Sequence, residues 1–268
     1  MSVEDADGDR PADFETGRYL YCVVAVGDGD DADGESAASG DALAFDADGV
    51  EGESVYAIRA DGLAALVHET DSLYDADDIT RVREWLLDHQ SVVDEAGEAF
   101  GTPLPFRFDT VVTGDDEAVR EWLRDASDDL HAHLADLAGH WEYRVEVART
   151  DDPEFEDDRL DELAAEIEAA DEGRAFLLEK QRDRRRTELR RAADDDVAAD
   201  ARERLRPLAW EFEENDAADE HVAASFSLLA HEDDEGAIGE QLDAVAARDG
   251  IEVRFTGPWP PYSFAPEL

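Results

Sequence analysis

The sequence predicts a two-domain protein of the α+β class, and three observations carry this prediction. The chain has 268 residues, of which 43% are hydrophobic, which is enough for a substantial core. Segments with the apolar period of an amphipathic helix alternate with short runs of aromatic and β-branched residues typical of strands. The polar segment from Thr150 to Pro153 separates two such groups. We therefore expect one domain over residues 18–150 and another over residues 151–268.

The N-terminal domain is expected to be ferredoxin-like with extra strands, because helices and strands alternate along it. Strands are predicted at residues 19–26, 54–59, 63–69, 104–112 and 141–148, and helices at residues 78–100 and 115–138. The sequence Ala60-Asp61-Gly62 predicts a hairpin turn between two of the strands. Ile79 and Leu86 lie on the apolar face of the first helix, which we expect to be buried.

Two acidic segments of the N-terminal half are expected to lie outside its core. Residues 1–17 are predicted to form a disordered acidic tail. Residues 27–54 are predicted to form an acidic loop insertion, because they are rich in Asp, Gly, Ser and Ala.

The C-terminal domain is expected to be α+β with long projecting helices and a Pro/aromatic tail. Helices are predicted at residues 160–170, 174–205 and 234–248, and strands at residues 208–213, 221–230 and 251–255. Gly173 is expected to interrupt or kink the helical segment between the first and the second of these helices. The second helix should end before Pro207, because the residue before a proline disfavours helical backbone.

The charge balance is strongly one-sided. The chain has 73 acidic and 24 basic residues, a formal net charge of -49, and Lys180 is its only lysine. At about 1 M salt the screening length falls to about 3 Å, so such self-repulsion would be largely screened. The simplest interpretation is a protein of a halophile that works in molar salt. The same surface repels phosphate, which argues against a nucleic-acid partner.

The composition also predicts a cytoplasmic protein that is not inserted in a membrane. No apolar run approaches the roughly 18 residues of a spanning helix. The acidic N-terminus lacks the basic and then apolar pattern of a signal peptide. The single cysteine, Cys22, excludes an internal disulfide and a thiolate metal cluster.

No constellation in the sequence indicates an enzyme, and we predict no catalytic residue, cofactor or metal. His131 and His133 point about 200° apart on a helix, so they cannot bind one ion together. The sequence contains neither the phosphate-binding motif Gly-x-x-x-x-Gly-Lys nor a Gly-x-Gly-x-x-Gly motif after a strand. Arg107, within a predicted apolar strand, is expected to be buried and structural, with Asp109 as one possible partner.

The segment from Thr256 to Phe264 contrasts most with the rest of the chain. It holds three prolines and three aromatic residues and no charged residue. Pro260 and Pro261 favour a stiff, extended path. Its aromatic residues, Trp259, Tyr262 and Phe264, could pack on the chain's own core or act as anchors for a partner.

A second contrast is the basic segment from Arg174 to Arg191. It holds eight basic residues and three acidic ones, in a chain that is otherwise acidic. The candidate contact residues in this segment are Arg174, Lys180, Arg184 and Arg185. They could form ion pairs with the chain's own carboxylates, or a docking face for an acidic partner or another copy of the chain.

Three segments resemble the gas vesicle protein F/L family. They are the C-terminal Gly-Pro-Trp-Pro-Pro-Tyr-Ser-Phe, the Leu-Pro-Phe-Arg-Phe-Asp-Thr strand from Leu104, and the Gly-Arg-Ala-Phe-Leu-Leu-Glu-Lys helix from Gly173. Asp109 stands where the family usually has Gly, and Phe176 where it usually has Tyr. The length is more similar to that of the L member.

The resemblance implies an accessory structural protein of gas vesicle formation, chaperone-like and associated with the vesicle. It implies binding to the small hydrophobic vesicle shell protein and to other accessory gas vesicle proteins. We expect the aromatic tail and the basic helix to contribute to that binding. Two alternatives are a cytosolic enzyme with a site between its domains, and a homo-oligomeric scaffold built through the basic helix.

Overall fold

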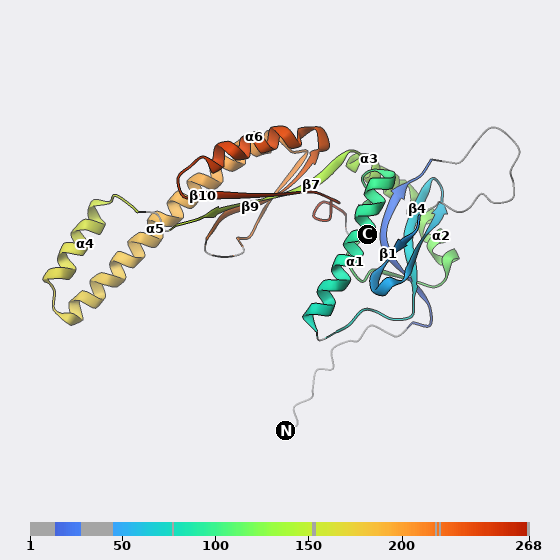
Figure 1. Ribbon diagram of the computed structural model, residues 1–268, viewed down its shortest axis with the longest axis horizontal. Helices are drawn as coiled ribbons and strands as arrows, with labels where there is room; N and C mark the ends of the chain where they lie inside the picture. Colours follow the sequence, from blue (N-terminus) through green and yellow to red (C-terminus); the bar gives the residue numbers. More distant parts are fainter. Residues whose placement is uncertain are drawn as a thin grey trace, which may run out of the picture. The chain divides into compact units, whose positions relative to one another are not determined.

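The chain forms two compact units in the computed structural model, which describes residues 14–27, 45–76, 78–151, 154–217, 219 and 221–266 (Figure 1). The first unit comprises Met1–Trp141 and Trp259–Leu268, and the second comprises Glu142–Pro258. Helices and strands occur in both, which confirms the α+β class. Most of the predicted tail and insertion lies outside the described residues.

The first unit is built on an antiparallel sheet with helices on both faces. Its strands are β1 (Gly17–Ala25), β2 (Ala47–Asp48), β3 (Ser54–Ala60), β4 (Leu63–Thr70), β5 (Leu104–Pro105) and β6 (Val111–Thr113). Its helices are α1 (Ile79–Phe100), α2 (Asp116–Asp125) and α3 (Ser127–Leu137), with a 3-10 turn η1 at Val50–Gly52. The strand order is β2-β3-β4-β1-β5, and β6 also pairs with β1. Figure 1 shows α1 and α2 on opposite sides of the sheet, and all of β1 except its last residue is buried.

The predicted hairpin is confirmed in its register and its turn. Ala60 of β3 pairs with Leu63 of β4, which leaves Asp61 and Gly62 as a two-residue loop. Both loop residues have left-handed backbone, with φ of 50° and 75°. This is the conformation of the type I′ turn, which matches the twist of antiparallel strands and favours an Asp-Gly sequence.

Three N-terminal elements differ from the prediction. The helix expected over residues 115–138 is broken at Ala126, whose φ of -98° and ψ of 6° leave the helical region. The strand expected over residues 104–112 is split into β5 and β6, because Asp109 between them has a left-handed φ of 68°. Part of the predicted insertion joins the sheet, because Ala47 pairs with Val55 and Val50 is fully buried.

The second unit has the β-α-β-β-α-β order of a ferredoxin-like fold. Its strands are β7 (His140–Arg149), β8 (Glu211–Asn215), β9 (Val222–His231) and β10 (Ile251–Trp259). Its helices are α4 (Asp158–Ala169), α5 (Glu172–Leu205) and α6 (Glu235–Ala246), with 3-10 turns η2 at Arg206–Leu208 and η3 at Glu232–Asp234. The strand order is β10-β7-β9-β8, so the first strand of the unit lies inside the sheet.

This topology corrects the expected position of the ferredoxin-like sheet. The strand predicted at residues 141–148 was assigned to the N-terminal domain, but as β7 it lies between β10 and β9. The compact units divide at Trp141 instead of near Thr150, and the residues from Trp259 onward belong to the first unit. The boundary is set by strand pairing between segments that lie far apart in the sequence. The polar residues near Thr150 carry no information about that pairing.

Helices α4 and α5 form a hairpin whose outer part extends beyond the sheet of the second unit (Figure 1). The break between them lies at Ala170 and Asp171 and not at Gly173, because the Asp171 carboxylate caps α5 by accepting from the amide of Arg174 at 3.0 Å. The predicted end of α5 before Pro207 is confirmed. Its later part contacts β9 and α6.

The core of the first unit contains a network of tyrosines and histidines that the sequence did not indicate. Tyr19 and Tyr21 point to the same face of β1, and both are fully buried. The Tyr19 hydroxyl lies 2.8 Å from Nδ1 of His89, and the Tyr21 hydroxyl lies 2.7 Å from Nδ1 of His68. Each hydroxyl also accepts a backbone N–H, from Asp109 at 3.1 Å and from Val50 at 2.9 Å.

The hydrogen bonds fix the protonation of His89. Its Nε2 lies 3.1 Å from the carbonyl oxygen of Phe106, which can only accept, so Nε2 carries the proton. Nδ1 is then an acceptor and the Tyr19 hydroxyl donates to it. Burial lowers the pKa of His68 and of His89 to about 4, which holds both rings neutral near pH 7.

Replacing Tyr19 by Phe should destabilise the first unit by about 2 kcal/mol, because the buried amide of Asp109 and Nδ1 of His89 both lose their partner. Tyr56→Phe is the matched control: its hydroxyl donates to Asp116 at 2.9 Å in a partly exposed position, so it should cost less. Chemical unfolding in molar salt measures both. Equal losses for the two variants would show that the buried network stabilises the protein no more than a partly exposed hydrogen bond does.

Candidate partner-binding site

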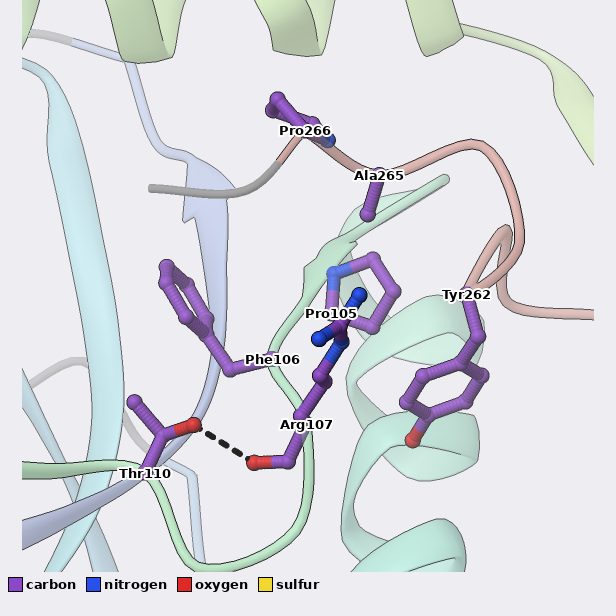
Figure 2. Close-up of a pocket in the computed structure, with 7 residues that line it drawn as sticks. All are labelled: Pro105, Phe106, Arg107, Thr110, Tyr262, Ala265 and Pro266. Carbon is purple, nitrogen blue, oxygen red and sulfur yellow. Dashed lines mark hydrogen bonds between the residues drawn. The ribbon is translucent and has the colours of Figure 1, made fainter.

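Two of the segments singled out in the sequence meet in the first unit and form a pocket. The residues that follow Trp259 pack against the segment between β5 and β6 (Figure 2). The cavity has a volume of about 300 Å³. It is lined by Pro105, Phe106, Arg107, Thr110, Tyr262, Ala265 and Pro266. Four of these seven residues are apolar, and the others bring one guanidinium and two hydroxyls, those of Thr110 and Tyr262.

One wall of the pocket is the loop between β5 and β6. The amide of Phe106 donates to the carbonyl oxygen of Tyr21 at 2.9 Å, which is the last backbone bond to β1 before the loop. Asp109 then adopts its left-handed conformation, and its amide donates to the Tyr19 hydroxyl. The Thr110 hydroxyl donates to the carbonyl oxygen of Arg107 at 2.7 Å, which closes the loop (Figure 2).

The other wall is the C-terminal segment, which turns back on the chain. The amide of Tyr262 donates to the carbonyl oxygen of Pro260 at 2.8 Å, and that of Phe264 to Pro261 at 3.2 Å. The expected straight path of the two prolines therefore ends in a turn. Pro260 and Pro261 are buried, and the Tyr262 ring packs on the core with its centroid 6.3 Å from that of His89.

The three aromatic residues of this segment differ in what they expose. Tyr262 and Phe264 are half-buried, whereas Trp259, the last residue of β10, has 36% of its surface exposed. Of the two alternatives for these residues, Tyr262 follows the first, because it packs on the chain's own core. Trp259 presents the most surface to a partner.

Arg107 corrects the prediction of a buried guanidinium. The residue is exposed, because the strand stops at Pro105 and leaves Arg107 in the loop. In Figure 2 the side chains of Phe106 and Tyr262 flank it. The expected partner, Asp109, instead accepts a hydrogen bond from the amide of Tyr74 at 3.1 Å. Arg107 thus brings positive charge to a pocket that also holds apolar side chains.

The basic candidates lie in the second unit, on α5, so the structure does not bring them into this pocket. Arg185 is held by Asp157 at 2.7 and 3.3 Å and by Glu188 at 3.5 Å. Arg174 lies 3.6 Å from Glu166. Arg174 and Arg185 therefore form ion pairs with the chain's own carboxylates, which is the first of the two alternatives given for the basic segment.

Lys180 and Arg184 are exposed and differ from the other two basic candidates in forming no ion pair with another described residue. The Lys180 ammonium lies 5.2 Å from the centroid of the exposed Phe176 ring, within the range of a cation–π contact.

Sequence reasoning missed an exposed apolar surface on α1. Ile79 and Leu86 were expected to face the core, but they are 62% and 45% exposed, and Leu87 is 67% exposed. The core face of α1 is filled by Trp85, His89 and Val93 instead. The sequence did contain one indication of this exposed surface. Leu86 and Leu87 are adjacent, so they make the apolar stripe of the helix wider than the face that one core contact can cover.

The described residues include no group of three or more His, Cys, Asp or Glu that could hold a metal ion. Among the helices that the structure describes, none combines the length and the apolar character needed to cross a bilayer.

Comparison with known proteins gives a consistent result at the levels of family, relatives and fold. The model of the family described as gas vesicle synthesis protein GvpL/GvpF matches residues 17–266. Gas vesicle protein L2 of Halobacterium salinarum is 43% identical, over 98% of this chain and 96% of its own. Gas vesicle protein L1 of the same species is 40% identical over 99% and 96%, and gas vesicle protein L of Haloferax mediterranei is 36% identical over 82% and 73%.

The solved structures show the same fold. The crystal structure of the gas vesicle protein GvpF from Anabaena sp. superposes with a TM-score of 0.67 over 94% of this chain and 99% of that chain. The two sequences are 20% identical, so this likeness concerns the fold alone.

Proposed function

This chain belongs to the gas vesicle synthesis protein GvpL/GvpF family, and from that membership we propose that it binds the small apolar shell protein of the gas vesicle during assembly. The names of its relatives support an accessory role in gas vesicles. The proposed role is chaperone-like and not enzymatic. It takes place in the cytoplasm at the forming vesicle, together with other accessory gas vesicle proteins.

The observation that carries this proposal is the pocket between Arg107 and Tyr262. The two segments that form it lie far apart in the sequence, and each carries part of the family resemblance. The aromatic rings of Phe106 and Tyr262 offer an apolar contact, and Arg107 offers a positive charge beside it. This combination suits an apolar side chain that is followed or preceded by a carboxylate in the bound segment.

The charge of the rest of the surface supports a holding function. A shell subunit must expose large apolar patches before it assembles, and such patches aggregate. The formal charge of -49 keeps the accessory protein strongly hydrated. Binding at one apolar pocket of a highly charged protein would keep the subunit soluble until it joins the vesicle wall.

Arg107→Glu should weaken shell-protein binding by roughly tenfold, because it puts a like charge where the bound carboxylate would lie. Pull-down of co-expressed shell protein in molar salt measures the retained fraction. Arg206→Glu makes the same charge change at an exposed position of η2 in the second unit, outside the basic segment, and should retain the shell protein as the unchanged chain does.

Trp259→Ala and Phe264→Ala test the other two aromatic residues of the C-terminal segment, which are not among the residues that line the pocket. Trp259 is the more exposed of the two, so its truncation should reduce retention. Most of its surface is buried, so the stability of the variant is measured alongside. Full retention by Arg107→Glu, with native circular dichroism, would exclude this pocket as the binding site, and full retention by Trp259→Ala would exclude a contribution from Trp259.

A further inference from the structure

The exposed large hydrophobic residues gather on two helices of the described chain. Five of the seven lie on α1 or α5: Ile79, Leu86 and Leu87 on the former, Phe176 and Leu177 on the latter. Single exposed apolar residues are ordinary, but grouped ones on a soluble protein indicate contact with a partner. The two groups lie in different units, so they are two separate surfaces.

The group on α5 lies among mainly positive charges. Lys180, Arg184 and Arg191 recur on the face of α5 that also holds Phe176 and Leu177, at about 100° per residue. Glu188 also lies on this side, and it forms an ion pair with Arg185 at 3.5 Å. The opposite side of the helix, with the buried Leu178, faces α4. Arg184 and Arg191 form no ion pair with any described residue. We call this surface, with its three cations and two apolar residues, the α5 face.

The group on α1 lies among mainly negative charges. The segment from Glu84 to Glu98 holds five acidic residues and no lysine or arginine. The exposed Arg83, one turn before Leu87, is a basic residue on the same side of the helix. Leu87 lies at the centre of the outward side of the helix, with Glu84 and Glu98 on that side. We call this surface, with Leu86, Leu87 and the acidic residues beside them, the α1 face.

We propose that the α5 face of one copy of the chain docks on the α1 face of a second copy. Both faces are helical, each has an apolar centre, and their charges are opposite, which is the complementarity that two packed helices need. The occupant is a second copy because every molecule presents both faces at once. The contact joins two different surfaces, so it is head-to-tail and builds chains or closed rings.

The two kinds of side chain have different roles in this contact. At about 1 M salt the charges act only over about 3 Å, so they select the partner and its orientation at short range. Burial of Phe176, Leu177, Leu86 and Leu87 supplies the affinity, since the hydrophobic effect is not screened by salt.

Two variants, each defective in one face, test the proposal. Leu177→Glu removes the apolar centre of the α5 face, and Leu87→Glu removes that of the α1 face. Their side chains are 60% and 67% exposed, so neither change should affect the fold. Sedimentation velocity in molar salt should show concentration-dependent association of the unchanged chain. Each variant alone should have a dissociation constant raised by roughly tenfold or more.

Mixing the two variants is the decisive step. In the mixture one intact α5 face meets one intact α1 face, so a 1:1 dimer should form and no larger species. Ala99→Glu is the control, because Ala99 is an exposed residue of α1 that lies about 120° around the helix from Leu87. It should associate as the unchanged chain does.

Several results would overturn the proposal. An unchanged chain that stays monomeric would show that the faces serve a different partner, such as another acidic protein. Association of Leu87→Glu at the unchanged affinity would indicate pairing of α5 with α5. The absence of a dimer in the mixture, with both variants folded, would exclude docking of α5 on α1.

Discussion

Lowering the pH from about 7 to about 5 should cost the first unit about 4 kcal/mol of stability, about 2 kcal/mol for each of His68 and His89. Both rings are buried, at 0% and 3% exposure, and burial lowers the pKa of each to about 4. In the unfolded chain the same rings titrate at about 6.5. As the pH falls below that value, the unfolded chain takes up protons that the folded chain refuses.

The direction of the effect follows from that difference in pKa. The stability that the neutral rings contribute is fully present above about pH 6.5 and is lost progressively as the pH falls toward about 4. Guanidinium unfolding at the two pH values, followed by tryptophan fluorescence, gives the change in the free energy of unfolding. Other groups also titrate between these pH values. The effect of the two histidines is therefore taken as the difference in pH dependence between the unchanged chain and a variant that lacks them.

The test compares the unchanged chain with the double variant His68→Gln and His89→Gln. The variant should be less stable near pH 7, because its core hydrogen bonds are poorer, but its stability should depend much less on pH. The exposed His131 provides the control, and His131→Gln should keep the pH dependence of the unchanged chain. An equal pH dependence in the double variant would contradict the assignment to the two buried rings.

Gly257→Ala should destabilise the second unit by about 3 kcal/mol. Gly257 has a φ of 133°, a conformation that side chains rarely adopt. A Cβ there would lie 2.8 Å from the carbonyl oxygen of Glu142 and 2.9 Å from Cδ1 of Tyr143, both on the neighbouring strand β7. A backbone oxygen cannot move aside without disturbing the sheet, so the clash and the backbone strain add.

Gly236→Ala is the matched control for this substitution. Gly236 is exposed on α6, and a Cβ there would meet nothing within 4 Å. In a helix alanine is favoured over glycine, so that variant should gain up to about 1 kcal/mol. Thermal unfolding of both variants measures the contrast. A neutral Gly257→Ala would mean that the close approach of β10 to β7 at this residue is not required.

The elements that were predicted correctly depend on local sequence. The hairpin at Asp61 and Gly62 follows from the backbone freedom of those two residues, and the extents of α1 and α5 follow from their caps and from Pro207. The split between β5 and β6 could not be predicted in this way. It depends on the contact of Asp109 with the Tyr19 hydroxyl, which belongs to a distant strand.

The candidate site was predicted in its parts and not as a whole. The contrast in composition identified the segment with Trp259 and Tyr262, and Arg107 was noted as unusual, but nothing in the sequence places these segments together. The exposure of Arg107 could not be predicted, because it depends on where the strand ends. The basic helix was identified from charge alone, and its complement on α1 became visible only with the exposure of Leu86 and Leu87.

The central claim is that this family member binds the vesicle shell protein, and co-expression of the two proteins tests it most directly. Affinity purification of this chain in about 2–3 M salt, where surface charge is screened, should recover soluble shell protein. The amount recovered should fall for Arg107→Glu and not for Arg206→Glu. A folded chain that retains no shell protein would contradict the claim and would leave binding of other accessory gas vesicle proteins as its role.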